Sequence, residues 1–314
     1  MSAAAPAESI LKVLAQDLTC DLDLSHDELT YLLDLAEQVK SSPARYARAL
    51  SGRYLSLLFE KPSLRTRMTF ELAIKQLGGD SVFSNGLIGE REPLQDVARN
   101  LDRWTQCIVA RTFSHETIRE LARWSRVPVV NALSNLYHPC QALADAFTLR
   151  ERFGQLRGLK LAFVGDGNNV AHSLMLTAAR LGVDFALATP ARYAPNPGIV
   201  SQAEGLAEVS GASLKITRRA DEAVAGAHAV YTDVWTSMGH EAEARQRQRD
   251  FRKYQVNERL FALAAPEAVF MHCLPARRNQ EVTGAVIESS RSVVFDQAEN
   301  RLHTQKALLL MLLE

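Results

Sequence analysis

Short apolar runs alternate with helix-patterned segments from about residue 25 to the end of the chain. Residues 54–59 (YLSLLF), 107–110 (CIVA) and 159–164 (LKLAFV) have the length and composition of buried strands. The segments between such runs carry apolar residues at helical spacing, and the connections are short. Strands and helices that alternate in this way form parallel sheets with right-handed crossovers. We therefore expect an α/β fold with doubly wound parallel sheets and ligands at the carboxyl ends of the strands.

The length of 314 residues is about twice that of a common domain, so each half can bury its own core. We expect a first domain over residues 1–149 and a second over residues 150–296, with the active site in the cleft between them. A helix over about residues 138–153 is expected to cross between the halves. Residues 292–296 (SVVFD) are expected to form a last strand, and the final helix, 297–314, to pack back on the first domain.

Charge and composition argue against several classes of protein. Lys plus Arg and Asp plus Glu are both 36, so no overall charge indicates a nucleic acid or membrane partner. The apolar stretches are far shorter than the roughly 20 residues of a membrane span, and the first 20 residues differ from a targeting peptide. The cysteines are isolated, which argues against a zinc site or a disulfide framework. We expect a soluble cytoplasmic protein without a metal.

The residues after the first apolar run suit a bound phosphate. In KPSLRTR, Pro62 and Ser63 are expected to open a helix whose free amides and dipole favour an anion. Arg65 adds a bidentate guanidinium and Thr66 a hydroxyl. A capped helix with solvated arginines is the alternative. Arg111, directly after the strand CIVA, repeats the arrangement at a second strand end.

Polar residues also follow other expected strands. In YHPCQ, His138 and Gln141 share a face at a helix start and can both address one small polar ligand, although His138 could instead cap its own helix. Asp233 stands at a strand end, where its carboxylate suits an ammonium group, and Asn169 can present an amide. Cys273 follows another strand, although the commonest fate of a lone cysteine is an inert buried thiol.

The segment VGDGNN follows a strand and opens a helix, as the phosphate loop of a dinucleotide site does. Val170 stands where that pattern needs its third glycine. The next strand ends in Ala188, Thr189 and Pro190, which offer no acid for a ribose. A nicotinamide-dependent oxidoreductase is therefore disfavoured.

Taken together, the motifs resemble the ornithine carbamoyltransferases in order and spacing over nearly the whole chain after residue 20. They are FEKPSLRTRMTFELA, ARTFSHET, LYHPCQALAD, VGDGNNVAHSL, YTDVWTSMG, MHCLPARR and DQAENRLHTQKALL. The resemblance implies that the first domain binds carbamoyl phosphate and the second L-ornithine. It implies carbamoyl transfer to the δ-amine, which gives L-citrulline and phosphate in arginine biosynthesis without a metal or cofactor. It also implies a homotrimer, or a multiple of trimers, with active sites near subunit interfaces.

The resemblance further implies roles for individual residues. Carbamoyl phosphate is expected to contact Ser63, Leu64, Arg65, Thr66, Arg111, His138, Pro139, Cys140, Gln141, Cys273, Leu274 and Arg301. Ornithine is expected to contact Asn169, Asp233, Ser237 and Met238. The residues expected to be catalytic are Cys273, Arg301, His138 and Arg111.

The chain departs from the family pattern near the phosphate motif. Leu64 stands where most members have a second hydroxyl, which leaves only its backbone amide for the phosphate. Leu87 stands where a glutamine is usual, and Arg91 is the candidate cation that a neighbouring subunit would borrow. Lys61 and Arg67 are expected to be structural or to face a neighbour.

Other functions remain as alternatives. Related transferases act on aspartate, putrescine or acylated ornithines. The segment DVWTSMG has an acidic group for an ammonium end and lacks a basic pair for a second carboxylate, which favours ornithine. A binding or regulatory relative without catalysis is a further alternative, and the loss of Cys273, His138 or Arg65 would have supported it. All three residues are present.

Overall fold

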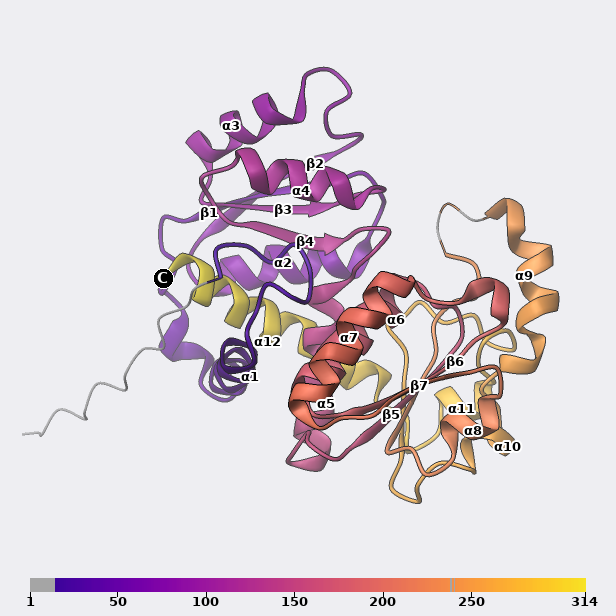
Figure 1. Ribbon diagram of the computed structural model, residues 1–314. Coiled ribbons are helices and arrows are strands. Elements are labelled where there is room, and N and C mark those ends of the chain that lie inside the picture. The colour runs from indigo at the N-terminus through magenta and orange to yellow at the C-terminus, as the bar shows by residue number, and fades with distance from the viewer. Residues whose placement is uncertain (1–14, 238, 240) are drawn as a thin grey trace, which may run out of the picture.

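The computed structural model describes residues 15–237, 239 and 241–314. Within these residues the chain forms two parallel sheets, each with helices packed on it, in two halves joined by long helices (Figure 1). The first sheet has the strand order β2-β1-β3-β4 and the second the order β7-β6-β5-β8-β9. The doubly wound parallel α/β fold expected from the alternation of strands and helices is therefore confirmed.

The strand order reverses once in each sheet, and open sheets bind ligands at such points. The reversal lies between β1 and β3 in the first sheet and between β5 and β8 in the second. The strands of the first sheet are β1 (Tyr54–Phe59), β2 (Asp80–Asn85), β3 (Cys107–Arg111) and β4 (Val129–Leu133). Those of the second are β5 (Lys160–Val164), β6 (Asp184–Ala188), β7 (Leu214–Thr217), β8 (Ala229–Tyr231) and β9 (Val269–Met271).

Helices connect the strands. The first half contains α1 (His26–Ser41), α2 (Leu64–Gln76), α3 (Leu94–Trp104), α4 (His115–Trp124), α5 (Pro139–Phe153) and the 3-10 helix η1 (Pro43–Tyr46). The second contains α6 (Asn169–Leu181), α7 (Pro197–Ser210), α8 (Ala220–Val224), α9 (Ala244–Phe251), α10 (Glu258–Phe261) and α11 (Gly284–Ile287). Its 3-10 helices are η2 (Ala191–Tyr193), η3 (Glu241–Glu243) and η4 (Arg252–Tyr254), and α12 (Val294–Leu313) ends the chain.

Local signals set the ends of two helices that shape the first half. Ser25 caps α1, and Ser25 and Glu28 each accept a backbone hydrogen bond from the other in a capping box. Gly154 ends α5 in a left-handed conformation (φ 76°), which glycine adopts without steric cost. Both helix ends follow from the sequence alone.

The prediction of a strand at residues 292–296 is wrong. Ser292 makes only an isolated bridge to Phe270, and α12 already begins at Val294, before the expected start at residue 297. Val294 is buried against the second sheet from within the first turn of α12. A short β-branched apolar run has the same pattern whether it is buried as a strand or as a helix turn.

A continuous apolar core joins the two halves. It contains Leu57 of the first sheet and Phe163 of the second, with Phe147 of α5 and Leu308 of α12 between them. Helix α12 packs against α1, α2 and α5, so the C-terminal helix returns to the first half as expected (Figure 1, yellow). None of the described helices is long and apolar enough to cross a membrane.

Gly167, in the VGDGNN segment, lies where two stretches of backbone touch. Its amide donates to the carbonyl of Tyr193 at 2.9 Å. A Cβ atom at this position would lie 2.4 Å from the backbone nitrogen of Pro195 and 2.7 Å from the Tyr193 oxygen. The glycine is therefore required by the packing of this chain on itself.

We predict that Gly167→Ala lowers the free energy of unfolding by about 1–3 kcal/mol, because backbone atoms must move to admit the methyl group. Gly205→Ala is the matched control, since a Cβ there meets nothing within 4 Å in α7. It should raise stability by about 0.5–1 kcal/mol. Urea unfolding measures both, and equal effects of the two substitutions would contradict the prediction.

Candidate active site

A cavity of about 500 Å³ lies where the two halves meet. It collects most of the residues predicted from the sequence, which are Ser63, Leu64, Arg65, Thr66, Arg111, His138, Asn169, Asp233, Ser237, Cys273, Leu274 and Arg301. Pro139, Cys140 and Gln141 are buried in the first turn of α5 and do not line the cavity. Met238 lies outside the described residues.

The start of α2 forms one wall of the cavity. The backbone of Ser63 is extended, and its hydroxyl accepts from the amide of Thr66 at 3.3 Å, so Ser63 caps the helix. The helix therefore begins at Leu64, not at Pro62 or Ser63 as expected. The amides of Leu64 and Arg65 lie in the first turn and have no carbonyl partner within the helix. They remain available to an anion, and the helix dipole favours one there.

Arg65, Arg111 and Arg301 bring guanidinium groups to the cavity from α2, β3 and α12. Arg111 is the last residue of β3, where the sequence placed it just after the strand. The Nε atoms of all three arginines are buried without a hydrogen-bond partner among the described residues. Arg301 donates from Nη2 to the Thr66 hydroxyl at 2.6 Å.

The pKa values of these arginines reflect their shared burial. Burial, and then the neighbouring charges of Arg301 and Arg65, lower the pKa of Arg111 to about 10. Burial also lowers the pKa values of Arg65 and Arg301. The groups stay charged at neutral pH, so an anion in the cavity would relieve both the lost hydration and the mutual repulsion.

His138 precedes α5 and faces the same cations. Burial and then the charges of Arg301, Arg111 and Arg65 lower its pKa well below 6.5. Its imidazole does not cap the helix, and Nδ1 is buried without a partner among the described residues. The ring is therefore neutral at pH 7 and can donate one hydrogen bond without releasing a proton.

A buried carboxylate fixes the orientation of Gln141. Asp145 Oδ1 accepts from Nε2 of Gln141 at 2.8 Å and from Nε2 of Gln297 at 2.6 Å. Gln297 in turn accepts from the backbone amide of His272 at 3.0 Å. Because its nitrogen is committed to Asp145, Gln141 is left with a buried Oε1 that has no described partner. That oxygen can accept a hydrogen bond from an amide group of a ligand.

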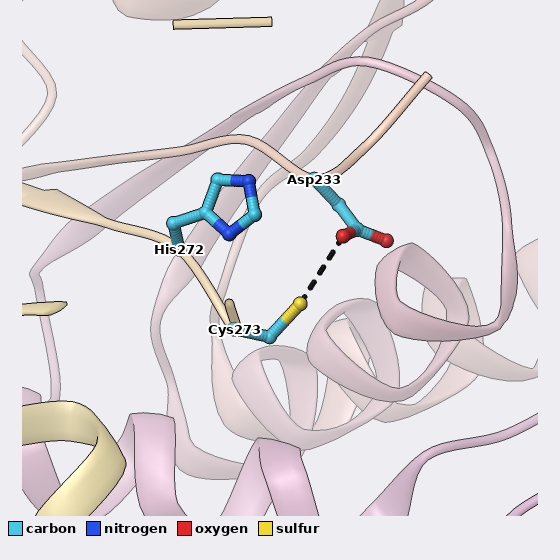
Figure 2. A group of neighbouring side chains, drawn as sticks. All are labelled: Asp233, His272 and Cys273. Atoms are coloured by element: carbon cyan, nitrogen blue, oxygen red, sulfur yellow. Dashed lines mark hydrogen bonds between the residues drawn. The ribbon is translucent and has the colours of Figure 1, made fainter. Parts of the chain in front are cut away.

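Asp233 and Cys273 meet at the ends of β8 and β9. Figure 2 shows the thiol pointing at the carboxylate, to which Cys273 donates at 3.1 Å. Burial, followed by the charge of Asp233, raises the pKa of Cys273 well above 9, so the group is a neutral thiol. Asn168 donates to the second oxygen of Asp233 at 2.9 Å. The carboxylate is thereby held from two sides.

His272, Asp233 and Cys273 also present donor atoms within 4.8 Å of one another, a spacing that could suit a metal ion (Figure 2). The ring nitrogens of His272 are already engaged, however. Nδ1 accepts from the Leu274 amide at 2.9 Å and Nε2 lies 3.2 Å from an oxygen of Glu281. In this geometry the histidine holds the loop after β9, and a metal would have to displace one of these partners.

Sequence reasoning missed several residues of the cavity wall, among them Lys61, Asp166, Asn168 and Arg277. The adjacent asparagines in GNN contained a signal for Asn168, because the first of two such residues before a helix is a common N-cap. Its Oδ1 does cap α6, through the amides of Val170 and Ala171.

Lys61 and Arg67 have different positions, although the sequence grouped them. Lys61 is 7% exposed, lines the cavity and lies 4.5 Å from the ring centre of Phe113. Arg67 pairs with Glu71 at 2.7 Å and lies over the ring of Phe83. Lys61 thus adds a further cation to the cavity, whereas Arg67 supports the fold.

The cavity therefore has a cationic wall from the first half and a wall with a fixed carboxylate from the second. An anion suits the first wall and an ammonium group the second. The neutral donor His138 also lines the cavity, and the acceptor Gln141 is buried in the first turn of α5. This arrangement fits the joining of an anionic substrate to an amine.

Comparison with known proteins agrees with this chemistry. The family model described as aspartate/ornithine carbamoyltransferase, carbamoyl-P binding domain, matches residues 16–151, and the Asp/Orn binding domain of the same family matches residues 157–312. An ornithine carbamoyltransferase of Thermus thermophilus is 53% identical over 290 residues, which are 91% of this chain and 93% of the relative. One of Listeria monocytogenes is 47% identical, over 95% of this chain and 96% of the relative.

A solved structure has the same fold. The ornithine carbamoyltransferase from Pyrococcus furiosus superposes with a TM-score of 0.92 at 44% identity, over 96% of this chain and 97% of that one. The matches of sequence and of structure extend through both sheets and the helices that join them. The chain therefore belongs to the aspartate/ornithine carbamoyltransferase family.

Proposed function

We propose that the chain transfers the carbamoyl group of carbamoyl phosphate to the δ-amine of L-ornithine, giving L-citrulline and phosphate. The observation that carries the proposal is the group of three guanidinium groups, each with a buried Nε that has no described partner, which share one cavity with a fixed carboxylate. The relatives named ornithine carbamoyltransferase, which match both halves, support the same substrates. The first half would bind carbamoyl phosphate and the second ornithine.

In this proposal the phosphate of carbamoyl phosphate lies at the start of α2. The first-turn amides, with the hydroxyl groups and guanidinium groups around them, supply its hydrogen bonds. The residues involved would be Ser63, Leu64, Arg65, Thr66, Arg111 and Arg301. The side chain of Leu64 is 71% exposed, so its contribution is the backbone amide. The charge of Lys61, which also lines the cavity, would add to the positive potential around the phosphate.

The carbamoyl group would lie against the start of α5 and the loop after β9. The free Oε1 of Gln141 accepts from the carbamoyl nitrogen, and His138 donates to the carbamoyl oxygen. Pro139 and Cys140, buried in the first turn of α5, would pack beneath the carbamoyl group, and Cys273 and Leu274 would contact it from the second half. Leu274 has a left-handed backbone (φ 55°) whose amide is held by His272.

Ornithine would enter from the second half, with its ammonium group at Asp233. Ser237, Asn169 and Met238 are the further predicted contacts. Asn169 donates to the carbonyl of Ser134 at 2.8 Å, which ties the ornithine side to the loop before α5. The δ-amine then points at the carbamoyl carbon.

The reaction follows from these charges. The neutral amine attacks the carbamoyl carbon, the bond from that carbon to the phosphate oxygen breaks, and the amine proton leaves with the phosphate. Negative charge grows on the carbamoyl oxygen and on the leaving phosphate. His138, Arg65, Arg111 and Arg301 stabilise that charge, and donors placed in this way are worth about 3–4 kcal/mol each in mutational studies. Holding both substrates in one cavity supplies much of the rest.

The purified chain is tested with carbamoyl phosphate and a panel of ornithine, N-acetylornithine, putrescine and aspartate. We expect a ureido product from ornithine, because its ammonium group pairs with Asp233. Asp233→Asn should retain the fold and lose most of this activity. Product from another amine alone would overturn the substrate assignment, and no product from any amine would overturn the reaction.

A pair of substitutions separates the carbamoyl site from the phosphate site. Gln141→Leu should lower kcat/KM for carbamoyl phosphate by about 10- to 100-fold, because it removes an acceptor from a buried amide. It should leave the affinity for inorganic phosphate nearly unchanged. Arg65→Met should lower both kcat/KM for carbamoyl phosphate and the affinity for inorganic phosphate, since the Arg65 guanidinium faces the phosphate. Steady-state kinetics and calorimetry with phosphate measure the two effects, and equal losses of phosphate affinity would contradict the assignment.

We also propose that the chain acts in the cytoplasm, in arginine biosynthesis, as a homotrimer or a multiple of trimers. Exposed apolar side chains gather on the first half and support an interface there; they are Leu64, Met68, Leu72, Val82 and Leu87. Arg91, in the loop after β2, is exposed and available to a neighbouring subunit. Light scattering should give three times the mass of the 34.8 kDa chain, or a multiple of that, and a monomer would contradict the proposal.

A further inference from the structure

The loop before α5 is held by the first turns of α6, which belongs to the second half. Side chains of α6 form hydrogen bonds with every second residue of this loop. Asn169 Nδ2 donates to the Ser134 carbonyl, and His172 Nδ1 bonds to the Leu136 carbonyl. The Ser173 hydroxyl accepts from the His138 amide. Of these contacts, the one with Ser173 reaches His138 itself, at 2.8 Å. The position of His138 in the cavity therefore depends on where the Ser173 hydroxyl points.

Asp21 determines that direction. The Ser173 oxygen already accepts from the His138 amide, so its single proton must go to another acceptor. Asp21 Oδ2 lies 2.5 Å from the Ser173 oxygen and is that acceptor. The other carboxylate oxygen accepts from Thr177 at 3.3 Å, one turn further along α6. Asp21 is thereby buried against the second half, with 8% of its surface exposed.

The segment that carries Asp21 is itself fixed to the first sheet. Leu18 bridges to Val130 of β4. The carboxylate of Asp23 accepts from the amides of Thr19 and Cys20, which closes a tight turn around Asp21. The carboxylate of Asp21 is therefore presented to α6 from a rigid part of the first half.

We propose that Asp21 is a positioning residue for carbamoyl transfer, because it orients the Ser173 hydroxyl that holds the backbone of His138. The inference rests on the proposed role of His138 at the carbamoyl oxygen. Without Asp21, the hydroxyl of a helical serine can donate to the carbonyl four residues earlier, which for Ser173 is that of Asn169. The His138 amide would then lose its acceptor, and the imidazole would lose its fixed position.

Asp21→Leu tests the inference by removing the acceptor. We expect kcat to fall by roughly ten-fold or more, since small displacements of a catalytic group are costly. The KM for ornithine should change little, because the contacts to Asp233 are untouched. Asp21→Asn keeps an oxygen that can accept from Ser173, so it should restore most of the wild-type kcat. An Asn variant as slow as the Leu variant would overturn the inference.

A double-mutant cycle separates this role from general stability. Ser173→Ala alone should lower kcat as much as Asp21→Leu, and the double variant should be no slower than either single one. Thr177→Val is the control, since it removes the other partner of Asp21 and should leave kcat unchanged. Should Asp21→Leu fail to fold, Ser173→Ala still decides, and full kcat in that variant would overturn the inference. Wild-type turnover of ornithine, measured first, tests the proposed function separately.

Discussion

Unpaired positive charge in a buried place is the constraint on which the site depends. Burial lowers the pKa of Arg65, Arg111 and Arg301; the charges of Arg301 and Arg65 lower that of Arg111 further, and the charge of Arg65 that of Arg301. None of the three forms an ion pair with a carboxylate of the described residues. Such a group is unfavourable unless the surrounding fold holds it in place. The fold does so by taking each arginine from a different element, so that no single segment can relax and separate them. In the proposed function, an anionic substrate would supply the missing counter-charge.

The return of α12 to the first half therefore has a chemical consequence as well as a structural one. It places Arg301 beside Thr66 of α2, and it places Gln297 between Asp145 of α5 and the loop after β9. The two walls of the cavity are linked by hydrogen bonds through one helix that lies in the shared core. A displacement of α12 would disturb both walls of the cavity together.

The sequence predicted the fold and the grouping of most site residues, because parallel topology puts strand ends on one edge of a sheet. Arg111 and Asp233 could be placed for that reason. Side-chain orientation could not be predicted in this way. The free oxygen of Gln141 is set by Asp145, which also binds Gln297, 152 residues further along the chain. The prediction of a strand at residues 292–296 was wrong for a different reason, because the local pattern there fits a strand as well as a helix turn.

The charges that suit the substrates also set the protonation of the groups between them. Burial and then the arginine charges lower the pKa of His138, and burial and then the charge of Asp233 raise the pKa of Cys273. A neutral imidazole of such low pKa is a weak base, and a neutral thiol is a far weaker base than a thiolate. Asp233 already accepts on both oxygens. In the proposed reaction the departing phosphate is therefore the strongest base near the amine, and it would take the amine proton as it leaves.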